Sequence, residues 1–167
     1  VQHMPASFTA PLARRLHGLS KLTIKEALSG DVLRPNHVLI ANGGYHLELR
    51  RQGKFVKTLL RDGEPVSGHK PSADVMMKCA AEIYGPNCLG IIMTGMGRDG
   101  SNGCGHIRQR SGFVLGQDEA TSDVYGMNKV AFAEGCVDQQ FSLNDAATII
   151  TRQVARLWCR SRQTASV

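Results

Sequence analysis

Two short segments of this sequence contain residues that can move a proton or hold a charged intermediate. Gln2-His3-Met4-Pro5 places a histidine at what reads as a strand end, directly before a helical pattern. An imidazole titrates near neutral pH, so His3 is a candidate general acid or base. His69-Lys70-Pro71-Ser72 precedes another helical pattern, and we expect Ser72 to cap that helix.

A third segment, Thr94-Gly95-Met96-Gly97-Arg98-Asp99-Gly100, is a glycine-rich turn that follows a short apolar stretch. Glycines let a backbone approach a partner closely and free its N–H groups to point at it. An acidic residue in such a turn is a poor choice for binding an anion but a good one for orienting a histidine. Asp99 is therefore a candidate partner for a catalytic imidazole.

The same turn also fits a dinucleotide-binding fingerprint. Gly95, Gly97 and Gly100 satisfy G-x-G-x-x-G, and Asp118 stands eighteen positions after the last of them. Met96 and Asp99, however, would put bulk and negative charge where a pyrophosphate lies. A dinucleotide-dependent enzyme stays open as an alternative at this point.

The five cysteines form no C-x-x-C pair and are odd in number. We interpret them as reduced, buried thiols of a cytosolic protein. The spacing of Cys88, Cys104 and His106 does not suit a zinc site. No G-x-S-x-G nucleophile motif occurs in the sequence.

The elements that must position these residues change in type along the chain. A helix is expected from Ser7 to Gly18 with Phe8, Leu12, Leu16 and Leu19 on its apolar face. Further helices are expected at 71–85, from the glycine turn through Ile107, at 124–134, and from 142 or 144 to about 156. Strands are expected at 22–27, 37–41, 46–51, 54–60, 89–93, 112–116 and 137–141.

This order predicts an α/β fold. The strands at 46–51 and 54–60 form a hairpin across Gln52-Gly53. The later part alternates strand and helix, which indicates a parallel sheet with helices on both faces. We therefore expect a three-layer αβα domain with a mainly parallel sheet and an antiparallel β-hairpin.

Composition limits the classes of function. The 167 residues include 20 Lys+Arg and 14 Asp+Glu, a formal charge of +6, and suit one domain. Nucleic-acid binding is disfavoured because aromatics are 5% and no Lys/Arg run exceeds two residues. No apolar run is long enough for membrane insertion, and no secretory signal is present. The sequence begins without Met in what reads as a strand end, which we interpret as a fragment.

Taken in order, the segments resemble one known family, the chemotaxis-receptor protein-glutamate methylesterases of the CheB type. The likeness runs from residue 1 to about 150. The matching segments are Gln2-His3-Met4-Pro5 with Phe8-Thr9, Val38 to Gly43 with His46, His69-Lys70-Pro71-Ser72 with Asp74, Met93 to Gly100, Gln117-Asp118-Glu119, Val124 to Met127, and Gly135-Cys136-Val137-Asp138.

The resemblance implies a serine esterase with a Ser-His-Asp triad and no metal or organic cofactor. His3 falls on the family's catalytic histidine, Asp99 on its catalytic aspartate, and Met96 on the residue whose backbone N–H helps form the oxyanion hole. The implied reaction hydrolyses glutamate γ-methyl esters, and deamidates glutamines, on methyl-accepting chemotaxis receptors. The implied setting is cytoplasmic, with an upstream receiver domain and a sensor histidine kinase as partners of the full-length protein.

The family's nucleophilic serine lies upstream of the His3 segment, where this sequence has not yet begun. We therefore expect 1–159 to be a catalytic domain without its nucleophile segment, followed by a frayed polar tail at 160–167. The chain alone is then expected to be inactive, and the missing strand to leave an apolar strip beside Leu89–Met93 uncovered. A non-catalytic binding domain on the same scaffold is a second alternative. Asn42 and Asn128 replace prolines of the family and are expected only to loosen turns.

Overall fold

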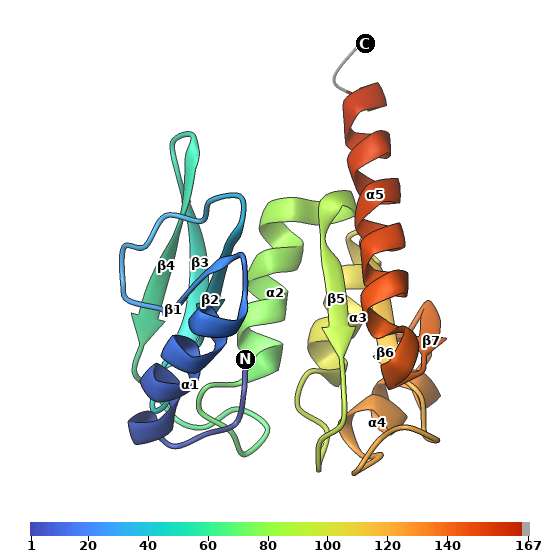
Figure 1. Cartoon of the computed structure of the whole chain (residues 1–167), viewed down its shortest axis with the longest axis horizontal. Helices are drawn as coiled ribbons and strands as arrows, with labels where there is room; N and C mark the ends of the chain where they lie inside the picture. Colours follow the sequence, from blue (N-terminus) through green and yellow to red (C-terminus); the bar gives the residue numbers. More distant parts are fainter. Residues whose placement is uncertain (165–167) are drawn as a thin grey trace. The chain divides into compact units, whose positions relative to one another are not determined.

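The computed structural model describes residues 1–164, which divide into two compact units at the bond between Cys79 and Ala80 (Figure 1). Both units combine helices with short strands. The first unit contains a parallel strand pair and an antiparallel one, and the second a three-stranded parallel sheet. These pairings confirm the expected α/β class with parallel strands and an antiparallel hairpin.

The first unit begins with helix α1 (Ala6–Leu19), which packs on the parallel strands β1 (Thr23–Glu26) and β2 (His37–Ile40). The hairpin of β3 (His46–Gln52) and β4 (Phe55–Arg61) closes at Gly53, whose φ of 57° suits glycine. The hairpin was predicted correctly.

The parallel pairing of β1 and β2 was not predicted, and the segment between them explains it. Val32 forms an antiparallel bridge with Lys57 of β4, and Leu33 donates its amide to the Val56 carbonyl at 2.9 Å. The chain after β1 therefore runs back along the hairpin before it returns beside β1. Helix α2 (Ala73–Tyr84) follows, and the buried core of this unit is formed by Ala27, Ala41, Leu47 and their neighbours Leu39, Leu60 and Met76.

The predicted apolar face of α1 is wrong in part. Thr9 and Ala13 are its buried residues, whereas Phe8 and Leu19 are exposed. Small side chains allow the helix to approach the strands closely, so burial on this helix follows side-chain size more than hydrophobicity.

The second unit has the strand order β5 (Leu89–Ile92), β6 (Phe113–Gln117) and β7 (Gln139–Phe141), all parallel. Helices α3 (Ser101–Gln109) and α4 (Met127–Ala133) pack on each other and on this sheet. In the described part of the chain β5 is an edge strand, with Leu89 and Ile91 half-buried. Two 3₁₀ turns lie at Gly85–Asn87 and Leu143–Asp145.

Two predicted helix boundaries in this unit are wrong. Helix α5 (Ala146–Thr164) continues past the expected end near Arg156, so residues 160–164 of the expected tail are helical, and 165–167 lie outside the described residues. Helix α4 begins three residues later than expected, because Val124 is hydrogen-bonded to Thr94.

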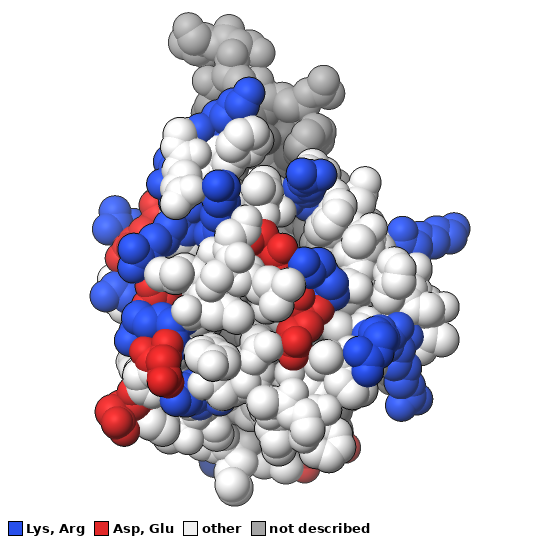
Figure 2. Space-filling model, turned by 90° about the vertical axis from the view of Figure 1, so that its left-hand side faces the viewer, with Lys and Arg blue, Asp and Glu red and all other residues white. Residues whose placement is uncertain are grey.

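The surface carries charges of both signs. On the face seen in Figure 2, Lys and Arg are interspersed with Asp and Glu. On the hairpin, for example, Glu48 lies between Arg50 and Arg61 and pairs with both. Burial raises the pKa of Glu48, but the two arginines outweigh it and hold that pKa below its ordinary value. None of the helices described is long and apolar enough to cross a membrane.

Candidate functional site

His3 lies against a second histidine. Its ring stacks on that of His69, with ring centroids 3.6 Å apart and the planes at 5°. The two rings, together with Pro5, Lys70 and other residues of the same two segments, line a surface pocket of the first unit. The sequence singled out both segments separately but gave no sign that they meet.

The start of α1 fixes the segment that carries His3. A Cβ on Gly43 would lie 2.6 Å from the Ala6 backbone and 2.8 Å from the Met4 carbonyl oxygen, so only glycine fits there. The Gly43 amide donates to the buried Thr9 hydroxyl at 3.2 Å, and that hydroxyl also bonds Glu26. Met4 and Ala6, which follow His3 closely in the chain, thus pack against Gly43 after β2.

A tight turn presents His69. Val66 and His69 exchange two backbone hydrogen bonds of 3.0 Å, and the residues between them, Ser67 and Gly68, have φ of 52° and 80°. The Ser67 hydroxyl bonds the carboxylate of the buried Asp74, in the first turn of α2, at 3.2 Å. This geometry fixes the position of the His69 backbone on the pocket rim.

His46, which belongs to the segments that carry the family resemblance, is a structural residue. Its ring is fully buried, its Nδ1 accepts the Ser72 amide at 3.3 Å, and its Nε2 donates to the Glu64 carbonyl at 2.9 Å. Both ring nitrogens are occupied in the pattern of a neutral imidazole. Ser72 stands directly before α2, as expected.

The glycine turn at the carboxyl end of β5 contains the other two predicted site residues. The Asp99 side chain is 0% exposed, whereas Met96, three residues earlier, is 81% exposed. Gly97 and Gly100 both have φ of 90°, a conformation that suits glycine. The turn therefore buries its carboxylate and lifts Met96 to the surface.

The segment before α4 holds this turn in place. Gly95 donates its amide to Val124 and accepts from the Met127 amide, at 3.0 and 2.8 Å. A Cβ on Gly126 would lie 2.5 Å from the Gly95 carbonyl oxygen and 3.2 Å from the Met96 Cα. The two backbones are therefore in contact. Gly126 lies in Val124 to Met127, one of the segments that carry the family resemblance.

A buried polar network is hydrogen-bonded to the first residue of the turn, Thr94. Gln117 at the end of β6 accepts the Thr94 amide at 2.9 Å, and Asn128 donates to the Gln117 carbonyl at 2.9 Å and to the Ser122 hydroxyl at 2.7 Å. The expectation that Asn128 only loosens a turn is wrong, because its buried side chain ties α4 to β6.

The groups that a dinucleotide would need have other partners. The Gly95 amide is bonded to Val124, and the Asp118 carboxylate accepts from the Thr121 amide and hydroxyl at 3.0 and 2.6 Å. With its carboxylate committed to this turn, Asp118 is a turn residue rather than a ribose ligand. The geometry gives no support to the dinucleotide alternative.

The cysteines are free thiols in different settings. Cys88 and Cys104 are buried, Cys79 and Cys136 are half-buried, and Cys159 is exposed, so the expectation of burial is wrong for Cys159. Burial raises the pKa of Cys88 to about 11. Burial and the Glu134 charge also raise the pKa of Cys136, against the opposing effect of Arg108. Neither thiol is activated as a nucleophile.

The described residues contain no cluster of three or more His, Cys, Asp and Glu side chains that could hold a metal ion.

The predicted site residues fall in two places. Met96 and Asp99 share one turn of the second unit, and His3 joins His69 in the first unit. The pairing of His3 with Asp99 stays a prediction.

Comparison with known proteins identifies the family. A family model described as CheB methylesterase matches residues 1–150. The chain belongs to this family. Two curated relatives, both called protein-glutamate methylesterase/protein-glutamine glutaminase, come from Rhizobium johnstonii and Xanthomonas oryzae pv. oryzae and are 46% and 47% identical to it over 155 and 156 residues.

These alignments cover 92% of this chain but 42% and 44% of the relatives, so the chain spans less than half of their length. The crystal structure of the CheB methylesterase catalytic domain of Thermotoga maritima matches with a TM-score of 0.85 at 35% identity, covering 93% of this chain and 79% of that one. The match confirms both the predicted resemblance and the fold class.

Proposed function

We propose that this chain is the larger part of a serine-type catalytic domain that hydrolyses glutamate γ-methyl esters on methyl-accepting chemotaxis receptors. Deamidation of receptor glutamines is the same acyl chemistry with ammonia as the leaving group. The observation that carries the proposal is the glycine turn, which buries the Asp99 carboxylate and presents Met96 three residues away. The names of the curated relatives support the same reaction.

In this reaction a serine hydroxyl, in a segment upstream of residue 1, attacks the ester carbonyl carbon. His3 takes the hydroxyl proton and returns it to the methoxide, which leaves as methanol. Water, deprotonated by the same imidazole, then hydrolyses the acyl-enzyme and leaves a glutamate carboxylate on the receptor. No metal or organic cofactor takes part in these steps.

Each remaining residue has one role. Asp99 accepts the second ring N–H of His3, which fixes the tautomer and stabilises the imidazolium. The Met96 backbone N–H, flanked by Gly95 and Gly97, donates to the oxyanion. His69 is a positioning residue, because its ring stacks on that of His3.

The proposed setting is the cytoplasm, where a receiver domain upstream in the same protein and a sensor histidine kinase control the enzyme. The surplus of positive charge, +6 in this chain, suits docking on acidic receptor helices. Without the upstream serine, the 167 residues alone are expected to release no methanol from a methylated receptor.

The test uses a protein that carries the upstream segment and measures methanol released from methylated receptor. Asp99→Asn should keep the fold but lower turnover by up to about 10⁴-fold, because the amide favours the wrong histidine tautomer. His3→Ala should lower it at least as much. Asp145→Asn, which removes a negative charge from an exposed site on the Leu143–Asp145 turn, is the matched control and should leave turnover unchanged.

Nearly full activity in either variant would end the assignment for that residue. Receptor binding without any methanol release by the parent protein would favour the alternative of a non-catalytic binding domain. Turnover by residues 1–167 alone, abolished by a serine- or cysteine-directed reagent, would place the nucleophile within this chain.

A further inference from the structure

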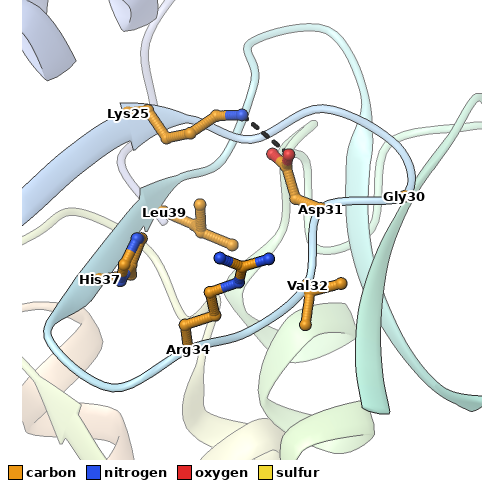
Figure 3. A pocket seen from close by; sticks show the side chains of 7 residues that line it. All are labelled: Lys25, Gly30, Asp31, Val32, Arg34, His37 and Leu39. Carbon is orange, nitrogen blue, oxygen red and sulfur yellow. Dashed lines mark hydrogen bonds and ion pairs between the residues drawn. The ribbon is translucent and has the colours of Figure 1, made fainter.

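The first unit has a second pocket, of about 340 Å³, beside β1 and β2 (Figure 3). Its polar lining consists of Lys25, Asp31, Arg34 and His37, and Leu39 and Val32 form its apolar walls. None of these residues has a role in the proposed esterase reaction. Three cationic or potentially cationic side chains and one carboxylate thus surround one cavity.

The carboxylate already has its partners. Asp31 Oδ1 accepts from Lys25 Nζ and Oδ2 accepts from the Leu28 amide, both at 2.8 Å. Burial raises the pKa of Asp31, but the bonds from Lys25 and Leu28 and the Lys25 charge outweigh it and lower that pKa. Asp31 therefore stays ionised and balances the charge of Lys25.

Arg34 supplies the charge in excess. Within residues 1–164 its guanidinium makes no hydrogen bond or ion pair, and Figure 3 shows it between Leu39 and Val32 with the Lys25–Asp31 pair beyond it. A guanidinium has five N–H donors in a fixed planar fork that matches an oxyanion. Arg34 is exposed, so its fork is accessible to a ligand that enters the pocket, and its hydrogen bonds to an oxyanion would be charge-assisted.

His37 adds a donor of known orientation. Its Nδ1 donates to the Pro35 carbonyl at 2.9 Å, since a carbonyl oxygen can only accept. This bond leaves Nε2 as the ring nitrogen that can meet a ligand, as a donor when the ring is protonated. The donors of Lys25, Arg34 and His37 surround the cavity from different sides (Figure 3).

We propose that this pocket binds a tetrahedral oxyanion of the phosphate class, with Arg34 as its main ligand and Lys25 and His37 as further donors. Donors on several sides suit the oxygens of a tetrahedral group better than those of a planar carboxylate. The ligand is free phosphate or the phosphate group of a small monoester, and both present the same oxygens to Arg34.

The test is an NMR titration of the 167-residue chain with inorganic phosphate at constant ionic strength, followed at the backbone amides of residues 25–39. Saturable shifts confined to this segment are expected. Arg34→Ala should weaken binding at least tenfold, and Arg15→Ala, which removes the same charge from an exposed position on α1, should change it less than twofold. No saturation, or equal weakening by both variants, would overturn the proposal.

A second variant should change the affinity for phosphate in the opposite direction. Asp31→Asn keeps an acceptor for the Leu28 amide but releases the Lys25 ammonium, so phosphate binding should tighten several-fold. Weaker binding in a variant whose amide spectrum is otherwise unchanged would contradict the assignment. Glycerol phosphate in place of phosphate distinguishes a monoester from the free ion, and acetate binding as tight as phosphate would overturn the tetrahedral class.

Discussion

The glycine turn of the second unit and the histidine pocket of the first hold their key side chains in different ways. Asp99 is fully buried, and hydrogen bonds and direct backbone contact with residues 124–127 fix its turn. His3 and His69 are half-buried, and their rings stack at a surface pocket. One region encloses its carboxylate, and the other presents its imidazole at the surface.

This difference suits the two roles in the proposed reaction. A group that stabilises charge works best when it is preorganised, since reorientation during the reaction is then unnecessary. A group that receives a proton and passes it on must face two partners in turn. Changes in the turn should therefore have large effects. In the histidine pocket, changes other than the loss of His3 itself should have smaller, graded effects.

After the loss of Asp99 itself, removing the Met96 amide should have the largest effect within the turn. Met96→Pro deletes the backbone N–H, and the loss of one oxyanion donor lowers kcat by roughly 10²–10³-fold. Met96→Ala keeps the amide and removes only an exposed side chain, so its kcat should stay within a few-fold of the parent. Esterase assays on both variants in a protein with the upstream segment compare them. Equal activity of the two would remove Met96 from the oxyanion hole.

The next largest effect is expected from a substitution that adds an atom where the turn contacts the segment before α4. In Gly126→Ala the new Cβ would lie 2.5 Å from the Gly95 carbonyl oxygen, so one backbone must move. Overpacking of this kind lowers the free energy of unfolding by about 1–3 kcal/mol, and here it should also lower kcat by moving Met96. Gly18→Ala is the control, because its new Cβ would meet no atom within 4 Å beyond its chain neighbours and the backbone of its own helix. Urea unfolding gives the free energy of unfolding of both variants. If Gly126→Ala is as stable as Gly18→Ala, the turn is not tightly held.

The sequence predicted the elements of both regions better than their contacts. Alternating strands and the Gln52-Gly53 turn located the hairpin, because period-two patterns and turn residues act locally. The buried face of α1 was misplaced, since Thr9 and Ala13 are buried by the close approach of Gly43 and β1, which periodicity does not record. The start of α4 failed for a similar reason, because Val124 bonds Thr94, thirty residues earlier.

The candidate site shows the same limit. His3, Met96 and Asp99 were singled out through the family resemblance, and the glycine turn was recognised from its residue types. The stack of His3 on His69 was missed, because it depends on a turn with positive φ at Ser67 and Gly68. Adjacent serine and glycine were a signal for such a turn, yet that signal does not say which ring the turn will meet.

Breaking the ring stack should have a moderate effect. An aromatic pair is worth about 0.5–1.5 kcal/mol, so His69→Ala should lower kcat roughly twofold to tenfold. His69→Phe keeps a flat ring and should keep kcat close to the parent. The NMR shifts of the His3 ring protons, measured in the 167-residue chain, should move in His69→Ala and much less in His69→Phe. A kcat for His69→Phe as low as that of His69→Ala would mean that the ring nitrogens of His69 act, and not the stack.

The smallest effect is expected at the surface of the glycine turn. Arg98 and Glu134 form an ion pair at 3.1 Å, but their side chains are 58% and 41% exposed. Water screens such a pair, so Arg98→Ala should lower the free energy of unfolding by only about 0.2–1 kcal/mol. Glu134→Gln should do the same, and high salt should shrink both effects. If the turn is held by the bonds of Gly95 to residues 124–127, both variants should keep the kcat of the parent despite their small loss of stability. A drop in kcat for Arg98→Ala but not Glu134→Gln would instead indicate that Arg98 contacts the substrate, and equal drops in both would show that the surface pair holds the turn.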